Sequence, residues 1–309
     1  MGFVAVEIIF VLIWAFGFIS VELALVDGGP FITLTIRLWI AAALLLPFFV
    51  RARHRFDRSR LSDAVIQGLT AQAFWLICIF QSQALGARPG EVALIAALQP
   101  LATAALAGWV VREPTEPRHW LGLALGLAGT VLVIAPGAEG SRGMALGHLV
   151  AAGAAITMTV AVLHRRRRGE AGESSPQGAS DGFAQLAMQF GVAAMVITPI
   201  AVFLEGWQAT WTPLYAANMV WQVTGQSIAS FGLLWWLLDR ASAVRVSSLF
   251  YFTPPVTMVL GYLAFGDRIG WLDGAGMALA LIGLIVVRMP ISRRSRARFP
   301  RLSSVCEKT

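Results

Sequence analysis

The sequence has little charge and almost no cysteine. Only 13% of its 309 residues are Asp, Glu, Lys or Arg, whereas about a quarter of an ordinary globular chain is charged. Its two cysteines, Cys78 and Cys306, are too few for a disulfide framework, and we assign them no redox role. Because 57% of the residues are hydrophobic, composition excludes an ordinary soluble domain.

Motifs of intramembrane enzymes and metal sites are also missing. The sequence contains no HExxH, no paired membrane aspartates and no Ser/His couple within an apolar run. His119 and His148 lie near expected helix ends without a second ligand at metal spacing. The stretch "GLALGLAG" at 122–129 follows no strand, so it is not a phosphate loop. We therefore expect no enzyme activity, no cofactor and no metal.

Apolar runs recur along almost the whole chain, each about 20 residues long and able to cross a ~30 Å hydrocarbon core as a helix. We expect an all-α polytopic membrane protein with ten transmembrane helices. The first run is too long for a signal-peptide core, so we expect a retained span. The expected helices cover 3–26, 30–50, 62–85, 90–111, 118–136, 143–163, 183–204, 213–238, 243–265 and 270–289.

The basic residues are distributed unevenly over the expected loops. All but four of the 24 Lys and Arg residues fall on one side of the membrane. The exceptions are Arg88, Arg142 and Arg268 on the other side and Arg37 within a helix. By the positive-inside rule we expect both termini to lie in the cytoplasm. We expect the membrane to be a bacterial-type inner (cytoplasmic) membrane. Topology accounts for the net charge of +7, and we expect no nucleic-acid partner.

An internal repeat relates the two halves of the chain at a separation of 154 residues. Pro100 in "EVALIAALQPLATAALAGWVVREP" aligns with Pro254 in "RVSSLFYFTPPVTMVLGYLAFGDR", and Thr103 aligns with Thr257. Each half holds five helices, an odd number, so the two copies insert with opposite orientation. Inverted repeats of this kind build transporters with a substrate site at the repeat interface.

The same register equates Gly122 with Gly276 and Gly129 with Gly283. Small residues at these positions favour close helix packing. We place the repeats at about 3–136 and 143–289. The segment 1–163 then ends at a flexible basic cytoplasmic loop, 164–182, and a basic cytoplasmic tail covers 290–309.

Three stretches resemble a known family. They are "IWAFGF" in the first helix, Arg37 in "TLTIRLWIAAALLL", and the unit "ALIAALQPLATAALAGWVVREPTEPRHWLGLALGLAGTVLVI". Together they resemble the EamA type of the drug/metabolite transporter superfamily, with ten helices in two five-helix repeats. The resemblance implies a central cavity lined by helices 1, 3, 4, 6, 8 and 9 and worked by alternating access, often for export. The sixth helix departs from the family, because "AAGAAITMT" lacks the usual Trp.

A polar arc follows one face of the eighth expected helix. Asn218, Gln222, Gln226 and Ser230 are spaced four residues apart, and unpaired amides in hydrocarbon cost several kcal/mol. The arc therefore faces protein or a wet cavity, and we favour a cavity wall over interhelical hydrogen bonding. Gln72, the repeat mate of Gln226, is its counterpart on the third helix.

Other residues are candidates for the same cavity. Pro100, Pro254 and Pro255 interrupt two helices and either kink them or free carbonyl groups for a ligand. The remaining cavity candidates are Trp14, Gln99, Thr103, Tyr251 and Thr257.

Arg37 is the one charge expected deep within a span, and an ionisable residue there is a functional candidate. Glu22 on the neighbouring antiparallel helix has a comparable depth, so we predict that the two form an ion pair. Between a functional role and a purely structural pair or a snorkelling side chain, we favour the structural interpretation. No carboxylate is expected at the midplane, so the sequence does not favour tight proton coupling.

These patterns predict a secondary transporter that exports a small polar or zwitterionic metabolite, such as an amino acid or an amino-acid-derived compound. An importer of a vitamin or nucleoside-like metabolite with the same fold is an alternative, and a channel or structural membrane protein is another. The expected partners are a small-molecule substrate and the lipid bilayer. The sequence leaves the oligomeric state open.

Overall fold

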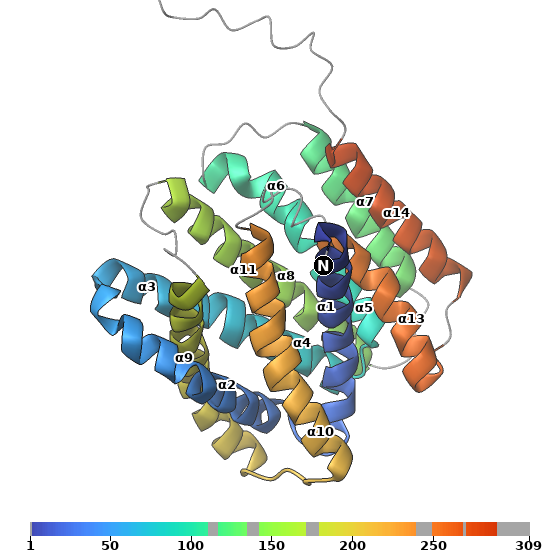
Figure 1. Ribbon diagram of the computed structural model, residues 1–309. Coiled ribbons are helices and arrows are strands. Elements are labelled where there is room, and N and C mark those ends of the chain that lie inside the picture. Colours follow the sequence, from blue (N-terminus) through green and yellow to red (C-terminus); the bar gives the residue numbers. More distant parts are fainter. Residues whose placement is uncertain are drawn as a thin grey trace, which may run out of the picture.

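The structure is a computed structural model that describes residues 2–110, 117–134, 142–170, 179–238, 249–267 and 270–288. Within these ranges the chain consists of helices joined by short connections (Figure 1). The first half contains α1 (Phe3–Leu25), α2 (Pro30–Ala52), η1 (Arg53–Arg55), α3 (Arg58–Gln67), η2 (Gly68–Phe74), α4 (Trp75–Ala84), α5 (Pro89–Ala96), α6 (Gln99–Val110) and α7 (Pro117–Ile134). The second half contains α8 (Arg142–Glu170), α9 (Ala179–Glu205), α10 (Pro213–Trp221), η3 (Gln222–Ala229), α11 (Ser230–Leu238), η4 (Phe250–Phe252), α13 (Thr253–Phe265) and α14 (Trp271–Arg288).

Each of the ten expected spans coincides with helix over the described residues, although four of them consist of shorter helices in line. By length and composition, five stretches of the described chain are long and apolar enough to cross a membrane: Phe3–Leu25, Pro30–Arg55, Arg58–Ala84, Gly143–Arg165 and Ser180–Glu205. The prediction of an all-α polytopic membrane protein is confirmed.

The sixth and seventh spans are longer than expected. α8 continues to Glu170 and α9 begins at Ala179, so the expected loop 164–182 is helical at both ends. Arginine is a good helix former, and His164 and Arg168 hold this extension of α8 against α3. Residues 171–178, 243–248 and the expected tail 290–309 lie outside the described residues.

Proline fixes where several helices begin. Pro30, Pro89, Pro117 and Pro213 are the first residues of α2, α5, α7 and α10. A first-turn proline loses no helical hydrogen bond, and its fixed φ angle suits the helix. At the other end of α13, Gly266 adopts a left-handed φ of 72° and ends the helix.

Two antiparallel helix pairs join the halves of the molecule: α2 packs along α9, and α7 packs along α14 (Figure 1). A Cβ added at Gly129 would lie 2.4 Å from the carbonyl oxygen of Gly276, and one at Gly283 would lie 2.7 Å from that of Gly122. The repeat equates Gly122 with Gly276 and Gly129 with Gly283, so a two-fold axis exchanges these two contacts. This is the packing that inverted repeats require.

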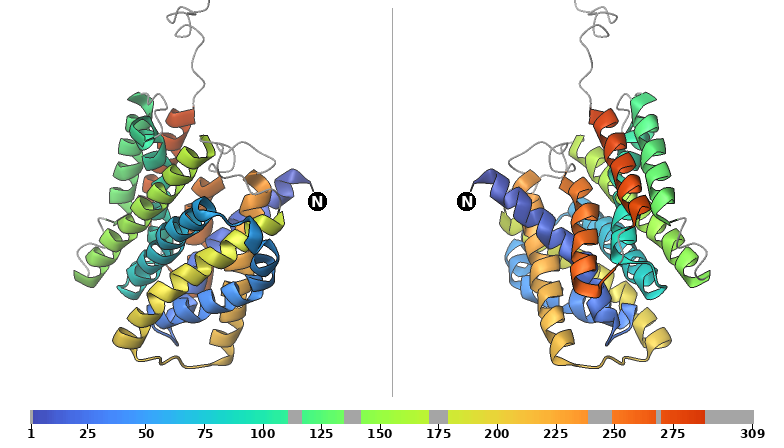
Figure 2. Two further views of the ribbon diagram at one scale, coloured as in Figure 1. Left: turned by 90° about the vertical axis from the view of Figure 1, so that its left-hand side faces the viewer. Right: turned by 90° about the vertical axis from the view of Figure 1, so that its right-hand side faces the viewer.

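α1 runs through the middle of the molecule and contacts α4, α5, α10, α11 and α13 (Figure 1). Its buried aromatic residues Phe10, Trp14 and Phe18 belong to the main hydrophobic core. Figure 2 shows the connection from α9 to α10 at the opposite end of the molecule from the C-terminal end of α14.

Candidate functional site

Two π-helical segments interrupt the third and eighth spans at matching places. η2 covers Gly68–Phe74 and η3 covers Gln222–Ala229, and the 154-residue repeat brings their first residues into register. π-Helical turns are rare and occur frequently at functional sites. Gln72 lies on the first and Gln226 on the second. The repeat thus places an unusual backbone, each time with a glutamine, at two symmetric positions.

A small cavity lies between α1, α2, α4 and the η3–α11 segment. Its volume is about 20 Å³, which is room for about one water molecule. It is lined by Trp14, Gly17, Phe18, Val21, Arg37, Trp75, Leu76, Ile79, Gln226, Ser230 and Phe231. The ring of Trp14 lies 5.8 Å from those of Trp75 and Phe231. Gln226 donates its amide to the carbonyl of Ile13 on α1. The structure therefore brings the predicted residues Trp14, Arg37 and Gln226 together.

Arg37 does not form the predicted ion pair with Glu22. Its side chain is 5% exposed, its Nε donates to the Ser227 hydroxyl at 2.9 Å, and its Nη1 donates to the Gln222 Oε1 at 3.4 Å. Both partners are neutral and belong to η3. Glu22 lines a different hollow, at the end of α1. Similar depth was not enough for pairing, because the two side chains leave their helices toward different neighbours.

Asn218 and Gln222 lie in the contact between the eighth span and α1. The Asn218 amide donates to the Ser20 carbonyl at 2.8 Å, and its oxygen accepts from the Ser20 hydroxyl at 2.7 Å. The Gln222 amide donates to the same carbonyl at 3.1 Å. In this conformation Asn218 and Gln222 join the eighth span to α1, Gln226 lines the cavity and also donates to α1, and Ser230 lines the cavity.

Gln72 and Gln83 are buried without a hydrogen-bond partner for either amide atom in the described structure. Their exposed fractions are 1% and 3%. Leaving a buried polar group unpaired costs about 1–3 kcal/mol. Such amides are therefore free to accept partners that another conformation or a solute supplies.

The candidates on the fourth and ninth spans lie apart from this cavity. Tyr251, Pro254 and Pro255 border a separate apolar cavity of about 20 Å³ against α5 and α14. The helix breaks are symmetric: Pro100 is the second residue of α6 and Pro254 the second of α13. The Gln99 amide donates to the Thr103 hydroxyl one turn away at 2.8 Å, and the Thr257 hydroxyl donates to the carbonyl of Ala15 on α1 at 3.3 Å.

A much larger hollow opens at the end where α1 joins α2 and α9 joins α10. Its volume is about 950 Å³, and we call it the vestibule. It is lined by Glu22, Leu25, Val26, Asp27, Gly28, Gly29, Pro30, Gln83, Ala84, Trp207, Gln208, Ala209 and Thr210. Leu25 and Glu22 extend the α1 face that carries Val21 and Phe18 of the small cavity. The vestibule and the cavity therefore follow one another along α1.

Charged residues cluster at the vestibule end of α5. Glu91 is 1% exposed. Its Oε1 lies 2.7 Å from Arg88 Nη2, and its Oε2 lies 3.0 Å from His148 Nε2 on α8. Arg88 also lies 3.8 Å from Asp273 on α14. Burial disfavours the charged form of Arg88, but the hydrogen bond to Glu91 and the charges of Glu91, Asp273 and Asp267 raise its pKa above the usual value. The cluster joins the two repeats at this end.

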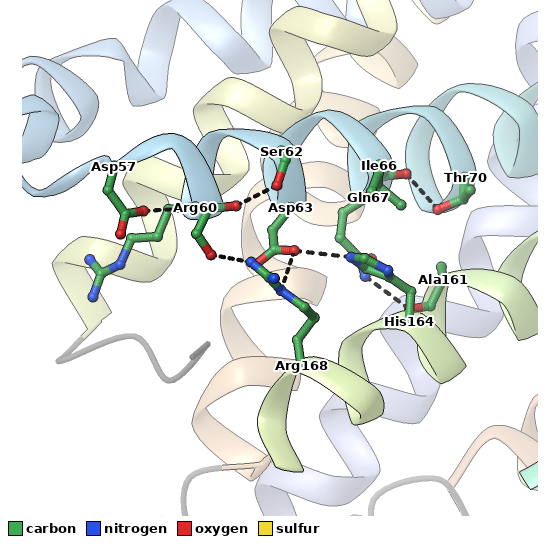
Figure 3. A network of polar contacts seen from close by, with 11 residues as sticks. Asp57, Arg60, Ser62, Asp63, Ile66, Gln67, Thr70, Ala161, His164 and Arg168 are labelled. Carbon is green, nitrogen blue, oxygen red and sulfur yellow. Dashed lines mark hydrogen bonds and ion pairs between the residues drawn. The ribbon is translucent and has the colours of Figure 1, made fainter. Parts of the chain in front are cut away.

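A second polar network joins the repeats at the opposite end (Figure 3). Asp63 on α3 is 4% exposed, and its Oδ1 lies 3.0 Å from His164 Nε2 and 3.0 Å from Arg168 Nε, both on α8. Arg168 also donates to the Ser59 hydroxyl, and the Gln67 amide donates to the α8 backbone at 2.9 Å. Nearby, Arg55 pairs with Asp181 of α9 at 3.0 Å. These contacts join α3 to α8 and η1 to α9 at the basic end of the described helices.

Asp63, Glu91 and their histidine partners were not predicted as contacts between the repeats. A signal was present, since Asp63 and Glu91 are carboxylates at the edges of apolar runs, and buried carboxylates are paired or hydrogen-bonded. The partners are far away in sequence. Among the described residues, no group of three His, Cys, Asp or Glu side chains is placed to hold a metal ion.

Comparison with known proteins identifies the family. The EamA-like transporter family model matches residues 2–135 and again 145–289. An uncharacterised transporter of Synechocystis sp. is 24% identical over 89% of this chain and 86% of its own length. A WAT1-related chloroplastic protein of Arabidopsis thaliana is 26% identical over 90% of this chain and 67% of its own.

A crystal structure of another protein has the same fold. It superposes with a TM-score of 0.62 at 20% identity and covers 92% of this chain and 95% of that one. The twofold family match agrees with the two repeats seen in the register, the π-helical segments and the glycine contacts. The chain belongs to the EamA-like transporter family and is a polytopic membrane transporter with two inverted repeats.

Proposed function

We propose that the protein is a secondary transporter that exports a small polar or zwitterionic metabolite, such as an amino acid or a compound derived from one, by alternating access. The observation that carries the proposal is the contrast between the two ends of the helices. One end holds a vestibule of about 950 Å³, whereas at the other end the described helices are held together by the pairs of Asp63 with Arg168 and Asp181 with Arg55. Such a shape suits a transporter that opens to one side at a time.

The proposed solute site lies deeper than the vestibule, at the cavity that Gln226 lines, with Gln72 as its symmetric counterpart. Each amide offers two donors and an acceptor. The amides of Gln72 and Gln226 could therefore hold a polar solute without any buried charge besides that of Arg37. The present cavity of about 20 Å³ is too small for a metabolite, so the helices around it must separate when the solute enters. A channel would instead need a continuous open path.

The proposed orientation places both termini in the cytoplasm of a bacterial-type cell, with the chain in the inner membrane. The basic residues of 51–60 and 164–168 then face the cytoplasm with the Asp63 network, and the vestibule faces outward. The alternative of an importer predicts solute loss from the medium instead of release into it.

The test starts from metabolites in the medium of cells that lack or overproduce the protein. We expect the exported solute to rise with overproduction and to fall with deletion. Gln226→Ala and Gln72→Ala should each abolish most of this difference, because each removes the amide proposed to bind the solute. Thr224→Ala is the matched control, since Thr224 lies in η3 but faces outward. Normal export by both glutamine variants would refute the proposed site.

A further inference from the structure

Arg37 is a buried cation with no acidic partner. Its guanidinium is bonded only to the Ser227 hydroxyl and the Gln222 amide oxygen, and within the described ranges no carboxylate lies within ion-pair distance of it. The buried acids Asp63 and Glu91, by contrast, each have an arginine partner.

A charge in this position is costly. Arg37 is 5% exposed in the interior of α2, and removing an ion from water costs several kcal/mol unless a counter-charge and good hydrogen bonds compensate for it. Neutral acceptors satisfy two of the five guanidinium donors but leave the charge unbalanced. If Arg37 served only to join α2 to η3, a neutral amide could make the same two contacts at lower cost.

The surroundings of Arg37 indicate what could balance its charge. Arg37 lines the same cavity as Trp14, Trp75 and Phe231. A guanidinium binds a carboxylate through two parallel hydrogen bonds, which adds geometric selectivity to the charge attraction. The three rings offer a wall for an apolar or planar body attached to that carboxylate.

We propose that Arg37 binds a carboxylate group of the transported solute, whose apolar or aromatic body lies against Trp14, Trp75 and Phe231. The proposal rests on the proposed function and narrows its substrate class to carboxylates. On binding, the solute carboxylate replaces Gln222 and Ser227 as the partner of Arg37. Because both residues belong to η3, solute binding then releases α2 from the π-helical segment and couples recognition to movement of the eighth span.

The first test uses the purified full-length protein and pairs of probes that differ only in the carboxylate: phenylacetate against phenylacetamide, and L-phenylalanine against L-phenylalaninamide. The acids should raise the melting temperature, because a ligand that binds the folded state stabilises it by mass action. The amides should not. Equal shifts from acids and amides, or no shift from either acid, would overturn the proposal. This comparison needs no variant.

The second test changes the protein. Losing a charge-assisted hydrogen bond is expected to weaken binding of the acids about ten- to a hundredfold in Arg37→Gln, with a smaller loss in Arg37→Lys. Arg51→Gln is the control, because Arg51 lies exposed in the last turn of α2. Unchanged affinity in a folded Arg37→Gln protein would refute the role of Arg37.

Transport by the wild-type protein separates this inference from the proposed function. If liposomes with wild-type protein transport an uncharged solute such as uridine but no carboxylate, the carboxylate proposal fails and transport stands. If wild-type protein moves no solute of any charge, the proposed function itself fails.

Discussion

Replacing Asp63 by Asn would remove the charge that holds α3 against α8 at the basic end of the bundle (Figure 3). Asp63 is 4% exposed and lies 3.0 Å from both His164 and Arg168, whose side chains are each 25% exposed. Removing one partner of a fully buried pair costs about 3–5 kcal/mol, and an exposed pair contributes less than about 1 kcal/mol. For this partly covered pair we expect about 2 kcal/mol, or a ~30-fold rise in the population open at this end.

An engineered cysteine measures that opening. Ala161 on α8 is 1% exposed, and its carbonyl accepts the Gln67 amide inside the network. In a background without Cys78 and Cys306, Ala161→Cys should react with a water-soluble maleimide ~30-fold faster when Asp63→Asn is also present. Ser62→Ala is the control, because Ser62 is exposed and bonds only to the Ser59 carbonyl of its own helix.

An unchanged labelling rate in an Asp63→Asn protein that remains monodisperse and melts normally would refute this role of the ion pairs. That result would mean that contacts other than the ion pairs close this end.

Two further predictions concern helix packing and pH. In thermal unfolding, Gly129→Ala should destabilise the protein by about 1–3 kcal/mol, because the added Cβ would lie 2.4 Å from the Gly276 carbonyl oxygen. Gly274→Ala on the same helix pair is the control. A Cβ there meets nothing within 4 Å, so this variant should be neutral or slightly stabilised. Burial, and to a lesser extent Glu91, raises the pKa of Asp267 despite the opposing charge of Arg88. A carboxyl group whose pKa is raised on folding contributes stability at pH values below its pKa in the unfolded chain, about 3.9 for Asp. That stability is lost as the pH rises through its pKa in the folded protein. Asp267→Asn should therefore raise the melting temperature increasingly between about pH 4 and neutrality, and a gain independent of pH would contradict this.

Much of the fold was predictable, because long apolar runs and a repeat are properties of the sequence itself. The 154-residue register paired Gly122 with Gly276, and the structure uses the corresponding glycines where α7 crosses α14. The breaks beside Pro100 and Pro254 were predicted as well, since proline removes a helical hydrogen bond. The π-helical segments were not, because hydropathy carries no signal for a shift of the backbone hydrogen bonds by one residue.

The partners of buried side chains were less predictable than the depth of these side chains in the membrane. Arg37 and Glu22 were expected to pair because their helices run antiparallel at similar depth, yet helix rotation directs Arg37 toward Ser227 and Gln222. The sequence could not show which residues of the polar arc on the eighth span only bond to α1 and which also line the cavity. That division depends on where α1 lies, which only tertiary packing determines.

The network around Asp63 escaped prediction for a related reason. Its histidine partner is 101 residues away, on a part of α8 that the basic composition had assigned to a loop. The sequence shows Asp63 at the edge of one apolar run and the arginines 165–168 after a different apolar run. Only the packing of α3 against α8 brings them together.

The most direct test of the central claim is counterflow of a labelled solute in liposomes that contain the purified protein. With the solute identified from the medium and loaded unlabelled inside, the labelled form should accumulate transiently above its outside concentration. Gln226→Ala should lose this accumulation, and Thr224→Ala should keep it. Simple equilibration of the label without an overshoot would indicate a channel, and no movement through intact folded protein would contradict transport by this chain.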